Sequence, residues 1–169
     1  MTDLRRIVVV GASLAGLHAA RALRRDGFDG NVTLVGDEPH DPYDRPPLSK
    51  QVLAGTWEPD RIGLLGPRDD DLDLDLILGT AATSLDVGRR TVALDDGTDL
   101  AYDGLVIATG ARPRWLPATR GMAGVHVLRT LDDALALRAD LDAGPRRVVV
   151  VGAGFIGAEV AATVRGRGI

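Results

Sequence analysis

A short apolar run that passes directly into a glycine-punctuated turn most constrains how this chain can fold. Residues 7–10 read Ile-Val-Val-Val and are followed by the turn from Gly11 to Gly16 (GASLAG) and by a helix-like stretch from Leu17. This order predicts a buried parallel strand, a tight turn and a helix that packs closely against the strand. The backbone N–H groups at the N-terminus of such a helix can bind a pyrophosphate.

The same pattern occurs again near the end of the sequence. Residues 148–151 are four valines, and Gly152, Gly154 and Gly157 follow them. The first copy has Ser13 where the second has Gly154, and a residue as small as serine still permits a pyrophosphate to approach. Two dinucleotide fingerprints in one chain predict two bound nucleotides and electron transfer between them.

Composition narrows the class of protein. The chain has 169 residues, of which 45% are hydrophobic and 26% charged, and a net charge of −4. This length is enough for a domain with its own core, and the negative charge argues against a nucleic-acid partner. No apolar run approaches the ~20 residues that span a bilayer. Residues 1–6 lead directly into the first strand, so we expect no secretory signal, no membrane partner and a cytoplasmic location.

Two residue types carry more information. The chain has no cysteine, which excludes a disulfide, a thiolate metal site and a cysteine nucleophile. Lys50 is the single lysine beside nineteen arginines, which indicates a specific task, with coding bias as the alternative. We expect no metal site, because the aspartates at 69–71 are typical of a solvated surface. We also expect no catalytic histidine at His18, His40 or His126.

The first strand and helix are followed by a segment suited to a nucleotide ribose. The helix is expected to end near residues 24–26, with Gly27 at its C-cap, and residues 31–35 predict a second buried strand. An acidic residue after this strand can accept hydrogen bonds from ribose hydroxyls. Asp37 is the preferred acceptor and Glu38 the alternative.

Residues 40–50 predict a stiff loop. Three prolines within residues 42–47 exclude a regular helix or a central strand before Leu48. The loop carries Arg45 and Lys50 beside the predicted nucleotide site, where cations can contact phosphate or a cofactor ring. A short helix is expected over residues 48–53, and residues 56–75 are expected to form a surface loop.

The remaining elements complete an α/β fold. Residues 76–78 and 81–85 predict short strands, residues 90–94 and 98–102 a hairpin, and residues 105–110 another buried parallel strand. A connector over 111–124 leads to a helix capped by Thr130 and Asp133. The fold class is therefore a Rossmann-like domain with a parallel sheet and a small antiparallel β insert, plus the first βα unit of a second Rossmann-like domain. Because one βα unit cannot bury its strand on both faces, we expect the sequence to be truncated.

Taken together, these motifs resemble the N-terminal part of FAD-dependent, NAD(P)H-dependent ferredoxin and rubredoxin reductases, within the pyridine nucleotide-disulfide oxidoreductase superfamily. The likeness covers the whole chain. Its most specific part is residues 42–50 (PYDRPPLSK); the two fingerprints, residues 35–38, 108–113 and 128–130 occur across the superfamily. The resemblance implies an FAD-binding domain over residues 1–112, a connector and helix over 113–145, and the start of an NAD(P)-binding domain over 146–169.

The resemblance also implies which residues contact the cofactors. FAD contacts are expected at Gly11, Ser13, Leu14, Ala15, Gly16, Asp37, Glu38, Arg45, Lys50, Ala82, Ala108, Thr109, Gly110 and Arg129. NAD(P)H contacts are expected at Gly152, Gly154, Phe155, Ile156 and Gly157. Relatives place a lysine like Lys50 beside flavin N5, paired with a glutamate like Glu159, and these two are the expected catalytic residues.

The implied activity is an electron transfer from NAD(P)H through FAD to a ferredoxin or rubredoxin-type iron–sulfur protein. Disulfide reductases of the superfamily keep a redox-active cysteine pair that this chain lacks, so electrons are expected to leave for an external carrier. The 169-residue chain is expected to be inactive alone, and the residue that selects NADH or NADPH is expected beyond Ile169. The alternatives are an NADH oxidase or nitrite reductase-type flavoprotein, and a catalytically silent nucleotide-binding module.

Overall fold

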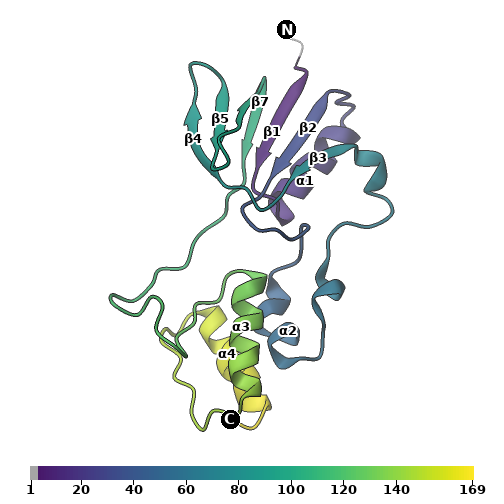
Figure 1. Cartoon of the computed structure of the whole chain (residues 1–169). Coiled ribbons are helices and arrows are strands. Elements are labelled where there is room, and N and C mark those ends of the chain that lie inside the picture. Colours follow the sequence, from purple (N-terminus) through teal and green to yellow (C-terminus); the bar gives the residue numbers. More distant parts are fainter. Residues whose placement is uncertain (1–3) are drawn as a thin grey trace. The chain divides into compact units, whose positions relative to one another are not determined.

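The computed structural model describes residues 4–169 (Figure 1). Residues 1–3, which belong to the opening segment in which no secretory signal is expected, lie outside the described residues. The chain forms two compact units. The first contains the chain up to Asp44 together with Gly63–Gly110, and the second contains Arg45–Ile62 together with Ala111–Ile169.

A parallel sheet organises the first unit. Its strands run in the order β3-β2-β1-β7, and their bounds are β1 Arg6–Val10, β2 Asn31–Val35, β3 Leu74–Ile77 and β7 Gly104–Ile107. In this register Val9 lies opposite Leu34 on one side and Val106 on the other. The predicted strands at 7–10 and 31–35 are confirmed.

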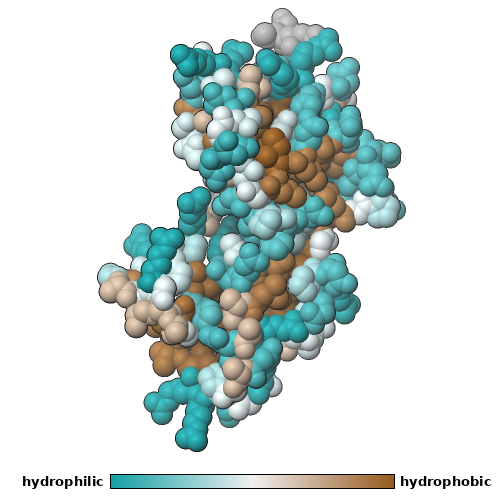
Figure 2. Space-filling view, viewed as in Figure 1, coloured by the Kyte–Doolittle hydropathy of each residue, from teal (hydrophilic) through white to brown (hydrophobic). Residues whose placement is uncertain are grey.

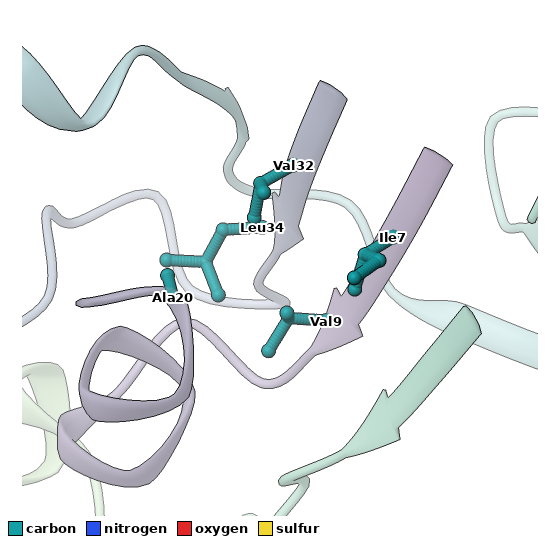
Figure 3. Packing of buried hydrophobic residues seen from close by; sticks show 5 residues of the cluster. All are labelled: Ile7, Val9, Ala20, Val32 and Leu34. Atoms are coloured by element: carbon teal, nitrogen blue, oxygen red, sulfur yellow. The ribbon is translucent and has the colours of Figure 1, made fainter. Parts of the chain in front are cut away.

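Helix α1 (Leu14–Arg25) packs against this sheet. Figure 3 shows the buried cluster between them, in which the side chains are no more than 5% exposed: Ile7, Val9, Ala20, Val32 and Leu34. The helix ends as predicted, with Asp26 as its C-cap and Gly27 following at a φ of +87°. Burial of alternate residues of β1 on this face explains why the first strand is so apolar.

The opposite set of β1 side chains packs against a small antiparallel sheet. This sheet consists of β4 (Ala82–Asp86), β5 (Thr91–Leu94) and β6 (Asp99–Ala101) in sequence order. Val8 and Val35 of the parallel sheet share a buried cluster with Val92 and Leu94 of β5. The predicted antiparallel insert and its hairpin are therefore confirmed.

The loop before β3 is more ordered than the surface loop that was expected over residues 56–75. It contains the 3₁₀ turn η3 (Asp70–Leu72), whose Leu72 is 8% exposed. Arg21 of α1 binds Asp69 through two hydrogen bonds of 2.8 Å and also donates to the Leu64 carbonyl. These contacts attach the loop to the helix. A second 3₁₀ turn, η2 (Pro59–Ile62), lies in the other unit and buries Ile62.

The second unit is helical. Its elements are the 3₁₀ turn η1 (Pro46–Ser49), α2 (Gln51–Ala54), α3 (Leu131–Asp142) and α4 (Phe155–Gly166). They surround a cluster formed by Leu53, Leu141, Val160 and Val164. The capping box of α3 is formed as predicted, whereas the helix expected from residue 48 begins at Gln51, because the prolines place residues 46–49 in a 3₁₀ turn.

Two expectations about strands are corrected. Residues 148–151 form no strand, and Val149 and Val151 are 77% and 70% exposed, because no described strand pairs with them. The strand β7 forms as predicted but is only partly buried: Ile107 is 66% exposed at the edge of the described sheet. Figure 2 shows that hydrophobic residues (brown) are exposed between hydrophilic ones (teal) on this face of the molecule.

Candidate nucleotide-binding site

The first fingerprint turn is built by direct backbone contacts. Gly11 follows β1 at a φ of +122°, and its N–H donates to the Val35 carbonyl at 2.7 Å. A Cβ on Gly11 would lie 2.1 Å from the Ala108 carbonyl oxygen, and a Cβ on Gly16 would lie 2.0 Å from the Gly11 carbonyl oxygen. Only glycine fits at both places, so no side chain covers the backbone of the turn at Gly11 and Gly16.

The N-terminus of α1 is arranged to receive an anion. Ser13 is its N-cap but makes no side-chain capping bond, and the first turn carries no acidic residue. Leu14 and Ala15 are exposed there. Helix α3 differs: the Thr130 hydroxyl accepts from the Asp133 N–H, which satisfies its terminus from within the chain. The uncapped N–H groups and positive dipole end of α1 suit a phosphate group.

The acidic residues after β2 have different surroundings. Asp37 is exposed, whereas the Glu38 carboxylate accepts a 2.5 Å hydrogen bond from the hydroxyl of Tyr43. Tyr43 is 5% exposed. The Glu38 carboxylate is therefore bound to a hydroxyl of the core. No sequence signal separates Tyr43 from an ordinary core residue, and its partnership with Glu38 went unpredicted.

The other predicted contacts of the first unit lie at strand ends. The Ala108 N–H donates to the Val10 carbonyl at 2.7 Å, which brings Ala108 beside the fingerprint turn. Thr109 and Gly110 follow it, with Gly110 at a φ of +68°. Ala82 begins β4 and packs with the cluster on the opposite face of the sheet from α1.

The second fingerprint has the same local geometry. Gly152 adopts a φ of +115°, and a Cβ on Gly157 would lie 2.4 Å from the Gly152 carbonyl oxygen. Gly154 is the N-cap of α4, which has no side-chain cap and no acidic residue in its first turn. Phe155 and Ile156 are 92% and 52% exposed. The turn therefore forms even though residues 148–151 pair with no strand.

The structure brings the two predicted catalytic residues together. Lys50 lies between η1 and α2, where its N–H donates to the Pro47 carbonyl and its carbonyl accepts from the Ala54 N–H. Its ammonium nitrogen is 2.8 Å from Oε2 of Glu159, which projects from α4. The two side chains are 38% and 37% exposed.

A third residue contacts the same carboxylate oxygen. The Ser49 hydroxyl donates to Glu159 Oε2 at 2.5 Å. The pKa of Glu159 is held below its usual value, first by the hydrogen bond from Lys50 and then by the one from Ser49. Both donors favour the ionised carboxylate, so Glu159 and Lys50 form a charged pair at neutral pH.

The predicted contacts Arg45 and Arg129 are also neighbours. Nη1 of Arg45 donates to the Arg129 carbonyl at 2.9 Å, and the Arg129 N–H donates to the Asp133 carboxylate at 2.9 Å. The capping box of α3 thereby fixes the backbone that Arg45 binds. Sequence reasoning placed Ser49 in the motif of residues 42–50 but gave neither Ser49 nor Thr163 a role in the site. The available signals were the position of Ser49 directly before Lys50 and the four-residue spacing of Glu159 and Thr163 on one predicted helix.

No helix within residues 4–169 combines the length and the apolar character that crossing a membrane requires. The sequence profile described as pyridine nucleotide-disulphide oxidoreductase matches residues 5–169.

The chain is also similar to individual reductases. It is 46% identical, over 164 residues, to the ferredoxin–NAD(+) reductase component of the p-cumate 2,3-dioxygenase system of Pseudomonas putida, covering 96% of this chain and 40% of that protein. In the crystal structure of the covalent putidaredoxin reductase–putidaredoxin complex, the reductase-like chain superposes with a TM-score of 0.86 at 43% identity, covering 96% of this chain and 40% of that one.

A further solved structure is the ferredoxin reductase for the CYP199A2 system from Rhodopseudomonas palustris. It superposes with a TM-score of 0.89 at 38% identity, covering 97% of this chain and 41% of that one. The chain thus spans about 40% of the length of the relatives it matches.

Proposed function

The chain belongs to the pyridine nucleotide-disulphide oxidoreductase family. We propose that it is part of an FAD-dependent reductase that passes electrons from NAD(P)H to a ferredoxin or rubredoxin-type iron–sulfur protein. The observation that carries this proposal is the pair of glycine turns of matching geometry, each at the N-terminus of an uncapped helix. The reductase names of the relatives support the acceptor class.

The residues of the first fingerprint fit the diphosphate of FAD. The space that a Cβ on Gly11 or Gly16 would need is occupied by backbone, which lets the bare turn approach a ligand, and α1 offers uncapped N–H groups. Asp37 would accept hydrogen bonds from the ribose hydroxyls. The turn of Gly152, Gly154 and Gly157, with Phe155 and Ile156, would hold the nicotinamide nucleotide. Bound FAD supplies the chemistry of accepting a hydride and releasing electrons singly.

Lys50 and Glu159 have the chemistry of a fixed charge beside a redox cofactor. The Lys50 ammonium would stabilise the negative charge that develops on hydride arrival, and Glu159 would hold that ammonium in place. Arg45 and Arg129 would add contacts to FAD. The chain has no cysteine, so it offers no dithiol as the next electron carrier. We place this activity in the cytoplasm, where reduced nicotinamide nucleotides are produced.

The proposal is tested on the protein isolated from its source cells. We expect a flavin absorbance spectrum, bleaching of that spectrum by NADH or NADPH without oxygen, and subsequent reduction of a [2Fe–2S] ferredoxin in stopped-flow mixing. Absence of bound flavin would overturn the proposal. Faster turnover with oxygen than with the ferredoxin would favour an NADH oxidase. Bound flavin that neither nucleotide reduces would indicate a silent nucleotide-binding module.

A further inference from the structure

Helix α4 and its C-cap residue carry three polar side chains that bind the segment containing Lys50. They are Glu159, Thr163 and Arg167, spaced four residues apart and so aligned along the helix. Thr163 Oγ1 donates to the Ser49 carbonyl at 2.8 Å, and Arg167 Nη1 donates to the Leu53 carbonyl at 2.8 Å. This polar stripe fixes α4 against residues 49–53.

Ser49 is held by this stripe at two points. Its hydroxyl donates to Glu159 Oε2 at 2.5 Å, while its carbonyl accepts from Thr163. The hydroxyl lies 3.4 Å from the Pro46 carbonyl, a much longer contact, so its single proton goes to Glu159. Ser49 is 4% exposed, so the residue that donates this hydrogen bond is buried.

We propose that Ser49 is a positioning residue, whose buried hydroxyl fixes the Glu159 carboxylate so that the Lys50 ammonium is held in one place. The role of that fixed charge in hydride transfer rests on the proposed function. The positioning of Glu159 by Ser49 rests only on the contacts given above.

The need for a third group follows from the exposure of the ion pair. Lysine and glutamate are both flexible, and a pair more than a third exposed loses much of its attraction to solvent screening and side-chain entropy. A hydrogen bond from a hydroxyl to an ionised carboxylate is stronger than one between two neutral groups. Because Ser49 binds the same oxygen as Lys50, it orients that oxygen whether or not Lys50 is in contact.

The composition of the chain makes the test direct. Lys50 is the only lysine, and Glu38, Glu58 and Glu159 are the only glutamates. NMR of the chain labelled at lysine ¹⁵Nζ and glutamate ¹³Cδ therefore gives one lysine signal and three glutamate signals. Two matched variants each remove one hydrogen bond at residue 49: Ser49→Ala removes the bond to Glu159, and Thr163→Val removes the bond to the Ser49 carbonyl.

We expect Ser49→Ala to move the Glu159 titration midpoint to higher pH and to shift the Lys50 signal, because the carboxylate loses a donor. Thr163→Val should leave both readouts at their wild-type values. In the wild-type chain, the Ser49 ¹³Cβ shift should titrate with the midpoint of Glu159, which tests the contact without any variant.

Two results would overturn the proposal: an unchanged Glu159 midpoint in Ser49→Ala, or equal shifts in both variants, which would mean that residue 49 serves only to dock α4. An FAD titration of the same samples separates this failure from failure of the proposed function. If the wild-type chain binds FAD but Ser49→Ala leaves Glu159 unchanged, only the positioning role is wrong. If Glu159 shifts but FAD does not bind, only the cofactor role is wrong.

Discussion

Lys50 Nζ and Glu159 Oε2 lie 2.8 Å apart and join two stretches of sequence that are distant from one another. Lys50 follows the proline-rich loop, and Glu159 lies in the second turn of the helix that the second fingerprint begins. The single lysine of the chain is thereby tied to the helix proposed to meet the nicotinamide nucleotide.

Replacement of Lys50 should slow flavin reduction. In the protein isolated from its source cells, Lys50→Ala is expected to lower the rate of reduction by NAD(P)H about 10²-fold, as for the loss of one preorganised electrostatic group. Anaerobic stopped-flow absorbance measures this rate, with Lys50→Arg as the variant that keeps the charge. A wild-type rate in Lys50→Ala would show that the charge has no part in hydride transfer.

The glycines of the second fingerprint should differ in their tolerance of a methyl group. Gly157→Ala places a Cβ 2.4 Å from the Gly152 carbonyl oxygen and is expected to cost about 1–3 kcal/mol of unfolding free energy. Gly154→Ala is the control, because a Cβ there meets nothing within 4 Å. Urea unfolding followed by circular dichroism compares the two. Equal stability of both variants would contradict the described turn.

Sequence reasoning succeeded where the signal is local or where the pairing strands are all present in the described chain. The capping box at Thr130 depends only on neighbours in the chain, and it forms. The apolar runs at 7–10 and 31–35 also form strands, because they pair with each other and the first also pairs with β7. The strand expected at 148–151 depends on pairing with another strand, which no local pattern guarantees. Its valines are exposed because the described residues offer no pairing edge there.

The candidate site likewise contains contacts that were predicted and contacts that were not. The Lys50–Glu159 pair was anticipated only through a family resemblance, and the hydroxyl of Ser49 that completes it was not anticipated at all. Ser49 and Glu159 are 110 residues apart, and nothing in either segment names the other as a partner. The hydrogen bond from Tyr43 to Glu38 was missed for a different reason: a buried tyrosine is typical of an ordinary core, so no sequence signal indicated a polar partner.

The ion pair of Arg21 with Asp69 should make stability fall in acid. Hydrogen bonds from the Arg21 guanidinium lower the pKa of Asp69 from 3.8 to about 2. A lowered pKa stabilises the fold fully above the ordinary value, and this contribution is lost as pH falls through about 2. Asp69→Asn should therefore be less stable than wild type near neutral pH. This difference in unfolding free energy should become smaller as the pH falls from 3.8 to about 2.

Urea midpoints measured across this pH range check the prediction, with Asp29→Asn as a control for the removal of one exposed carboxylate. A difference between wild type and Asp69→Asn that stays constant down to the lowest pH would mean that the carboxylate charge does not stabilise the loop.

The N-cap of α3 should contribute measurably to stability. Thr130→Ala removes the acceptor of the Asp133 N–H and is expected to cost about 1 kcal/mol, whereas Thr130→Ser keeps the cap. Thermal unfolding of the three proteins gives the comparison. Because Asp133 also binds the Arg129 N–H, the alanine variant should broaden the Arg129 amide signal as well. Equal melting of alanine and serine variants would argue against the capping box.

If the first fingerprint binds the diphosphate of FAD, calorimetric titration of the 169-residue chain with FAD should detect that binding. We expect saturable binding of one FAD per chain. FAD binding should be lost in Gly16→Ala, whose Cβ would lie 2.0 Å from the Gly11 carbonyl oxygen, and kept in Gly66→Ala, whose Cβ meets nothing within 4 Å. No binding by the wild-type chain, or undiminished binding by Gly16→Ala, would contradict FAD binding at the first fingerprint.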